Sequence, residues 1–69
     1  MTRVLMVRHR HRPNAVTSAV SLTEALNERG IEVVHDASLG GIDMVLSIGG
    51  DGTFLVAASS ARALDVPLL

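Results

Sequence analysis

Residues 44–53 read MVLSIGGDGT, and this stretch decides the fold. Its first five residues are almost wholly apolar, which is typical of a strand buried on both faces of a parallel sheet. Three of the next four residues are glycines, so the strand is expected to end there in a sharp turn. A helix is expected after the turn, over residues 53–64. The stretch therefore predicts a strand–turn–helix unit of an α/β fold.

Other apolar runs of strand length lie on either side of this unit. Residues 4–7 read VLMV and residues 31–34 read IEVV, while residues 66–69, VPLL, are expected to start a fourth strand. Strands that alternate with helices imply parallel pairing and right-handed crossovers. The sequence thus predicts an open parallel sheet of three to four strands with helices on both faces.

The two helices are expected to turn apolar residues toward the sheet. The first has about four turns, begins at Pro13 or Asn14, and ends before Gly30, which suits a left-handed C-cap. Its apolar residues are Ala15, Val16, Ala19, Val20, Leu22 and Leu26. The second helix is expected to face inward with Phe54, Ala57, Ala58, Ala61 and Leu64.

The composition excludes several classes of protein. With 48% apolar and 19% charged residues and a net charge of −1, the chain is no disordered tail. Its single aromatic residue, Phe54, argues against a reader of single-stranded nucleic acid, which stacks bases on several rings. Cysteine is absent, which excludes disulfides and thiolate metal sites, and lysine is absent too.

Sixty-nine residues make a marginal core, and the chain ends on an apolar run. We therefore expect residues 1–69 to be the N-terminal part of a single α/β nucleotide-binding domain that is truncated at its C-terminus. An edge strand that closes a complete domain is the alternative. The sequence has no apolar run of about 20 residues and no signal-peptide pattern, so the cytoplasm is the expected compartment.

Positive charge is concentrated near the start of the chain, before the first acid, Glu24. The four residues are Arg3, Arg8, Arg10 and Arg12. If the strand order is 2-1-3-4, the polar loop at residues 9–14 and the turn at residues 49–53 share one crevice, where open α/β sheets bind ligands. Arg10 and Arg12 would then face a nucleotide's phosphates. An exposed basic loop without a ligand is the alternative.

Histidines give a weaker signal. His9 and His11 have the spacing of metal ligands but lack a third ligand nearby, so no metal site is predicted. A lone histidine such as His35 is more often exposed than functional.

The turn itself suits a phosphate. Gly49, Gly50 and Gly52 leave the backbone bare, and the helix from Thr53 directs free N–H groups to the same place. Two familiar motifs fail, because a dinucleotide fingerprint would need glycine where Leu55 stands and a P-loop would need lysine.

A carboxylate inside a phosphate-binding turn repels the phosphate, so its presence suggests a chemical role. Asp51 could remove a proton from a hydroxyl, or carry Mg²⁺ to the phosphates. The alternative is that Asp51 only caps the following helix.

These residues resemble the ATP-dependent NAD kinases. The match runs through SIGGDGTFL at 47–55, then Ala57-Ala58, Ala61-Arg62 and residues 66–69. The GGDGT core also occurs in diacylglycerol and sphingosine kinases, and in a related form in phosphofructokinases. The Phe-Leu-x-Ala-Ala continuation is similar to NAD kinases, and the match covers roughly the first quarter of such an enzyme.

The resemblance implies transfer of a phosphoryl group from ATP, or from polyphosphate, to the 2′-hydroxyl of the adenosine ribose of NAD, with Mg²⁺, to give NADP. It implies that Asp51 is the base and that Asp51 and Gly52 contact NAD. It also implies NAD and ATP as partners, no nucleic acid or membrane, and a homo-oligomer at full length.

The sequence departs from the family pattern in places. Many members carry Arg or Lys five residues after the aspartate, where this chain has Val56. A Gly-x-Asn-x-Gly motif and a β-rich second domain are expected beyond residue 69, so the chain alone is expected to be inactive. Two alternatives stay open, a lipid kinase fragment and a non-catalytic α/β binding module.

Overall fold

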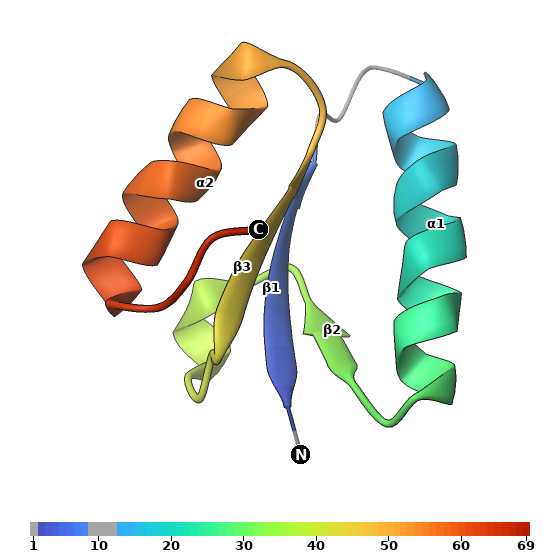
Figure 1. Cartoon of the computed structure of the whole chain (residues 1–69), viewed down its shortest axis with the longest axis horizontal. Helices are drawn as coiled ribbons and strands as arrows, with labels where there is room; N and C mark the ends of the chain where they lie inside the picture. Colours follow the sequence, from blue (N-terminus) through green and yellow to red (C-terminus); the bar gives the residue numbers. More distant parts are fainter. Residues whose placement is uncertain (1, 9–12) are drawn as a thin grey trace.

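The computed structural model describes residues 2–8 and 13–69. Three parallel strands form the sheet, β1 (Arg3–Arg8), β2 (Glu32–Val34) and β3 (Met44–Ile48), in the order β2-β1-β3 (Figure 1). β1 pairs with β3 over five residues but with β2 over only three. The predicted α/β class and parallel sheet are confirmed.

The predicted fourth strand is reduced to a bridge on the outer edge of β3. Leu68 pairs in parallel with Val45, and the N–H of Leu69 donates to the carbonyl of Val45 at 2.8 Å. The N–H of Val45 donates to the carbonyl of Pro67 at 2.9 Å. The segment thus lies where the order 2-1-3-4 puts it, but it is too short to be a strand in the described part of the chain.

Two long helices cover opposite faces of the sheet, α1 (Pro13–Glu28) on one side and α2 (Asp51–Leu64) on the other (Figure 1). A 3₁₀ helix, η1 (Ala37–Leu39), lies in the connection from β2 to β3. α2 begins two residues before the predicted start. The helix therefore includes Asp51 and Gly52, although glycine is a poor helix former.

Alternate residues of β1 reach the two cores. Val4 and Met6 are buried, as is Ala19 of α1. The hydroxyl of Thr23 in α1 lies 3.7 Å from the sulfur of Met6, so these residues belong to the α1 side. The main cluster contains Leu5, Val34, Val45, Ala57 and Ala61, and it lies on the α2 side. The period of two along β1 is what a strand between two layers requires.

Two residues predicted to face inward are exposed. Phe54 keeps 51% of its surface and Val20 keeps 54%. In α2 the buried residues are Thr53, Ala57 and Ala61, a spacing of four that turns small side chains toward the sheet. Phe54 lies beside that stripe rather than in it, and the helix packs on alanines instead of on the aromatic ring.

Both helices end in the same hydrogen-bond pattern. After α1, Gly30 has φ +80, and the N–H of Ile31 donates to the carbonyl of Leu26 at 3.0 Å, which confirms the predicted cap. After α2, Asp65 takes the left-handed conformation with φ +56, and the N–H of Val66 donates to the carbonyl of Ala61 at 3.0 Å. Asp65 is a non-glycine residue in a position that favours glycine.

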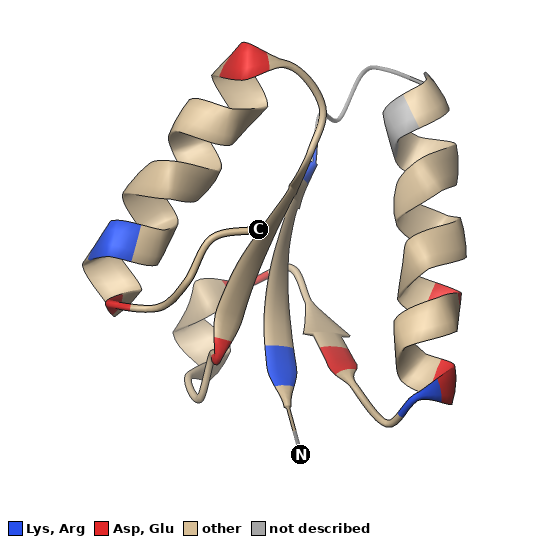
Figure 2. Ribbon diagram, viewed as in Figure 1, with Lys and Arg blue, Asp and Glu red and all other residues tan. Residues whose placement is uncertain are grey.

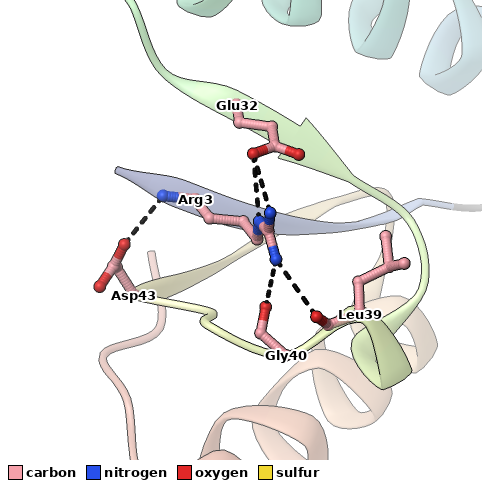
Figure 3. A network of polar contacts seen from close by, with 5 residues as sticks. All are labelled: Arg3, Glu32, Leu39, Gly40 and Asp43. Atoms are coloured by element: carbon pink, nitrogen blue, oxygen red, sulfur yellow. Dashed lines mark hydrogen bonds and ion pairs between the residues drawn. The ribbon is translucent and has the colours of Figure 1, made fainter. Parts of the chain in front are cut away.

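Charged segments of the sheet gather where the strands begin (Figure 2). There Arg3 joins three parts of the chain (Figure 3). Its guanidinium lies 3.1 Å from the Glu32 carboxylate and donates to the carbonyls of Leu39, at 3.2 Å, and Gly40, at 2.6 Å. Its backbone N–H donates to the Asp43 carboxylate at 2.8 Å. We call these five residues the Arg3 network; it fixes β2 and the β2–β3 connection to β1.

Candidate active site at the carboxyl edge of the sheet

The turn after β3 is built from backbone that only glycine adopts easily. Gly49 has φ +145, a value that L side chains rarely reach. Gly50 is the N-cap of α2 in an extended conformation, and it supplies no side-chain cap. The first helical hydrogen bond runs from the N–H of Phe54 to the carbonyl of Gly50, at 3.1 Å. The N–H groups of the three residues between them thus begin the helix without intrahelical acceptors.

Asp51 is the first residue of α2, and its side chain is exposed. The N-cap position is taken by Gly50, so a capping role does not account for Asp51 in this structure. An acid in the first turn does gain from the positive end of the helix dipole. Within the described residues Asp51 makes no side-chain hydrogen bond or ion pair, which leaves its carboxylate open to a ligand.

Gly52 occupies an unusual position for a glycine. It is the second residue of α2, in the first turn of the helix, and a Cβ built on it would meet no atom within 4 Å. Glycine costs about 1 kcal/mol relative to alanine in a helix interior. Neither the backbone conformation nor the packing of the described residues requires glycine at this position. The backbone of Gly52 borders open space next to Asp51.

Thr53 differs from its neighbours, because its side chain is buried with 8% of its surface exposed. Little of Thr53 is therefore accessible to a ligand, and its backbone N–H is one of those at the start of α2 without an intrahelical acceptor. Of the turn residues predicted to bind a cofactor, Gly49, Gly50 and Gly52 present bare backbone at one edge.

The predicted basic residues Arg10 and Arg12, together with His9 and His11, lie outside the described residues. What is described is the end of the strand before them. Arg8 is paired in register with Ile48, so β1 and β3 end side by side. This is the point where the chain reverses its direction through the sheet, and open α/β sheets bind ligands there.

Two further residues near this edge were not singled out as site residues from the sequence. Arg8 and the exposed His35 both line an open hollow of about 510 Å³ beside the end of β1. Only the position of Arg8 in the basic segment gave a signal, since His35 is a lone histidine in a loop. Among the described residues no group of three or more His, Cys, Asp or Glu side chains is arranged to hold a metal ion.

Comparison with known proteins identifies relatives over nearly the whole chain. An NAD kinase of Corynebacterium diphtheriae is 34% identical over 91 aligned positions, which cover 97% of this chain and 29% of that protein. An NAD kinase of Corynebacterium efficiens is also 34% identical, over 96% of this chain and 28% of its own length. The chain is homologous to NAD kinases.

The similarity to NAD kinases is stronger in a shorter stretch. An NAD kinase of Rhodococcus opacus is 59% identical over 39 residues, which are 56% of this chain and 12% of that protein. Because 91 aligned positions exceed the 69 residues present here, the Corynebacterium diphtheriae enzyme carries extra residues within the matched region.

The chain spans less than a third of the length of these NAD kinases. No family model matches it. No solved structure matches it either. None of the helices in the described residues is both long and apolar enough to cross a membrane.

Proposed function

We propose that this chain is the part of an NAD kinase that carries its general base, Asp51, at the carboxyl edge of the sheet. The enzyme would phosphorylate the 2′-hydroxyl of the adenosine ribose of NAD to give NADP. The homologues are named NAD kinases, and this chain matches under a third of their length. The proposal therefore concerns the longer protein, and we expect the 69-residue chain alone to be inactive. We also propose that the whole enzyme is cytoplasmic and homo-oligomeric, as the family resemblance implies.

One observation carries the proposal: Gly52, beside the exposed Asp51, is a helical glycine that the fold itself does not need. A Cβ there would meet open space, so the bare backbone suits the close approach of something outside the described chain. A sugar or phosphate that lies against Gly52 would meet the Asp51 carboxylate and the free N–H groups of the first turn together.

The chemistry follows from these parts. Asp51 would accept the proton of the ribose hydroxyl as that oxygen attacks the γ-phosphorus of ATP, since a carboxylate within hydrogen-bond reach of a hydroxyl can serve as a general base. The bond from the γ-phosphorus to the bridging oxygen of the β-phosphate would break, and ADP would leave. The N–H groups at the start of α2 would attract the negative phosphate oxygens. Phosphoryl transfer is mostly positioning and neutralisation of charge, and Arg10 and Arg12 would add positive charge from the loop after β1.

The donor would be ATP, or polyphosphate, with Mg²⁺. Mg²⁺ usually keeps several waters and takes one or two carboxylates together with substrate phosphates. The described residues, which offer single acids rather than a three-ligand cluster, fit a metal that arrives with the nucleotide. Bound in that way, Mg²⁺ would neutralise charge on the donor phosphates, and Asp51 would accept the proton of the ribose hydroxyl.

The direct test uses the protein that contains this chain. We expect it to form NADP from NAD with ATP or polyphosphate, and to leave diacylglycerol unphosphorylated. Phosphorylation of the lipid but not of NAD would overturn the proposal in favour of the lipid kinase alternative. Transfer to neither acceptor, in a folded protein that spans the whole reading frame, would favour the binding module.

Substitution of Gly52 tests whether its bare backbone is needed for the close approach of the substrate. Gly52→Ala is expected to raise the free energy of unfolding by about 0.5–1 kcal/mol, because alanine is the better helix former and has room. Turnover of NAD is expected to fall by about 10–100-fold, because the added methyl displaces the substrate by about 1 Å.

Ser59→Ala is the matched control, since Ser59 is exposed on α2 away from the turn. It is expected to raise helix stability slightly and to leave turnover unchanged. A Gly52→Ala variant that is more stable and fully active would remove the role assigned to the bare backbone.

A further inference from the structure

Asp51 and Gly52 form the only Asp-Gly pair in the sequence, and both residues are exposed at the start of α2. An aspartate that precedes a glycine can react with its own backbone, because the amide nitrogen of the glycine can attack the Cγ carbon of the aspartate. Glycine has no Cβ to hinder this approach, and its backbone rotates more freely than that of other residues. Whether the two atoms can meet depends on what holds each of them in the fold.

The amide group of Gly52 is not engaged in the helix. The first helical hydrogen bond is donated by Phe54 to the carbonyl of Gly50, so the N–H of Gly52 has no intrahelical acceptor. The Asp51 carboxylate makes no side-chain hydrogen bond or ion pair within the described residues. A Cβ built on Gly52 would meet nothing within 4 Å, so the space beside this residue is open as well. Neither reacting group is held by another part of the described chain.

Ring closure also requires Asp51 to rotate out of the helical conformation. The rotation is accessible here, because helix ends fray and Asp51 is the first residue of α2. Gly50 supplies no side-chain cap that would hold the first turn in place. Thr53 is buried, so the opening is confined to Asp51 and Gly52 and leaves the packing of α2 on the sheet intact.

The remaining aspartates are each followed by a residue that has a side chain, and they are Asp36, Asp43 and Asp65. The Asp36 carboxylate accepts the backbone N–H of Ser38 at 2.9 Å, and this bond lowers the pKa of Asp36 and so favours the ionised form, which is the poorer electrophile. The Asp43 carboxylate accepts the backbone N–H of Arg3 at 2.8 Å. After Asp65 the attacking amide would be that of Val66, whose N–H already closes the C-terminal turn of α2 at 3.0 Å. Asp51 alone among the four aspartates combines a glycine neighbour with a free amide.

We propose that Asp51 and Gly52 are a site of spontaneous isoaspartate formation. The nitrogen of Gly52 forms a bond to Cγ of Asp51, the hydroxyl of the carboxyl group leaves with the amide hydrogen as water, and a succinimide ring results. Water then opens the ring. Cleavage between the nitrogen and Cγ restores aspartate, whereas cleavage between the nitrogen and the backbone carbonyl carbon gives isoaspartate. In isoaspartate the chain runs through Cγ, and the free carboxylate is attached directly to Cα.

The modification needs only water and does not depend on the kinase reaction proposed above. It has a consequence for that reaction where Asp51 is the general base. The isoaspartate carboxylate reaches less far from Cα than that of aspartate, and the backbone gains one carbon at the start of α2. A molecule modified in this way would have its base out of position, and geometry errors of this size reduce turnover strongly.

The test stores the protein that contains this chain at neutral pH and physiological temperature. Its peptides are then mapped by mass spectrometry with electron-transfer fragmentation, which distinguishes isoaspartate from aspartate. Isoaspartate is expected to form at residue 51 at least about tenfold faster than at Asp36, Asp43 or Asp65, because only there does a glycine follow. A succinimide peptide, lighter by one water, is expected to precede it. Equal rates at the four aspartates would overturn the proposal. So would the absence of isoaspartate at residue 51 while an unfolded synthetic peptide of residues 47–57 is half converted.

Variants then test the two reacting groups. Gly52→Ala is expected to slow the formation of isoaspartate about tenfold, since the added methyl hinders the nitrogen and strengthens the helix. Asp51→Asn is expected to form the same succinimide faster, with loss of ammonia instead of water, so that aspartate and isoaspartate appear at residue 51 on storage. Ser59→Ala, at an exposed position of α2, is the matched control and is expected to keep the parent's rate.

An unchanged rate in Gly52→Ala, or an equal slowing in Ser59→Ala, would show that the pair is not the reactive element. A stable asparagine in Asp51→Asn would show that the start of α2 does not open far enough for ring closure. Each of these readings comes from peptide masses and needs no turnover. A protein that fails to phosphorylate NAD would therefore leave this proposal standing, and a protein that phosphorylates NAD without forming isoaspartate would remove this proposal alone.

Discussion

The two edges of the sheet use charge in opposite ways. At the amino edge, Arg3 is paired with Glu32, and its remaining donors are taken up by backbone carbonyls of the β2–β3 connection (Figure 3). At the carboxyl edge, Asp51 is exposed without a side-chain partner among the described residues, and Arg8 and His35 line an open hollow. Charges that satisfy one another hold a fold together, and charges without partners are the ones a ligand can use.

The largest effect is expected at the carboxyl edge. Asp51→Asn keeps the shape of the side chain but removes its ability to accept a proton, so kcat for NAD phosphorylation is expected to fall about 10²–10⁴-fold. The free energy of unfolding is expected to change little, because the Asp51 side chain is exposed.

Steady-state kinetics measure the fall in kcat, and urea unfolding of the same preparation measures the free energy of unfolding. Asp65→Asn, at the far end of α2, is the control and is expected to be fully active. Retained turnover in Asp51→Asn would place the proton acceptor elsewhere and break the contrast between the edges.

Arg3→Met is the converse variant at the amino edge. It removes the ion pair to Glu32 and two hydrogen bonds to carbonyls from a side chain that is 31% exposed. After allowance for solvent screening, a loss of about 1–2 kcal/mol in the free energy of unfolding is expected. Turnover per folded molecule is expected to stay the same.

Urea unfolding measures this loss, with Arg29→Met as the matched control at an exposed arginine. A drop in turnover without a drop in stability would show that the amino edge also serves the reaction.

A smaller effect, of opposite sign, is expected where α2 ends. Asp65 holds φ +56 and places a negative charge next to the negative end of the helix dipole. Asp65→Gly relieves both costs and is expected to raise the free energy of unfolding by about 0.5–1 kcal/mol. Asp65→Ala, which keeps a Cβ in the left-handed region, is expected to show a smaller gain or a loss. Thermal unfolding of the pair decides whether backbone strain or charge dominates.

The smallest effect concerns acid stability. The Asp36 carboxylate accepts the backbone N–H of Ser38 at 2.9 Å, and this bond holds the pKa of Asp36 below its ordinary value of 3.8. A carboxyl group with a lowered pKa in the folded state stabilises the fold above pH 3.8, and that contribution is lost as the pH falls further.

Asp36→Asn removes this titration, so its stability is expected to vary less with pH below about 4 than that of the parent. Unfolding midpoints between pH 2 and 5 measure the difference. Identical pH profiles would mean that the bond to Ser38 does not survive in solution.

Much of the fold followed from local patterns. The strand at residues 44–48 has the predicted bounds, and Gly30 adopts the predicted left-handed conformation, because apolar runs and helix caps are read from adjacent residues. The predicted inward positions of Phe54 and Val20 were wrong. Their exposure depends on how each helix is rotated against the sheet, which depends on contacts far apart in the sequence.

The candidate site was predictable only in part. The GGDGT turn carried its own signal, since glycines and an acid between a strand and a helix point to a ligand. The Arg3 network and the hollow lined by Arg8 and His35 join residues about 30 positions apart, and no local pattern marks them. Arg10 and Arg12 lie outside the described residues, so their role stays a prediction.

The unequal lengths of the strand pairings have a consequence for motion. β2 is held to β1 by three residue pairs, and β3 by five. In native-state hydrogen exchange the amide protons bonded between β1 and β2 should therefore be replaced by deuterium sooner than those between β1 and β3. Since His35 directly follows β2, each such opening also moves a residue that lines the hollow beside the end of β1.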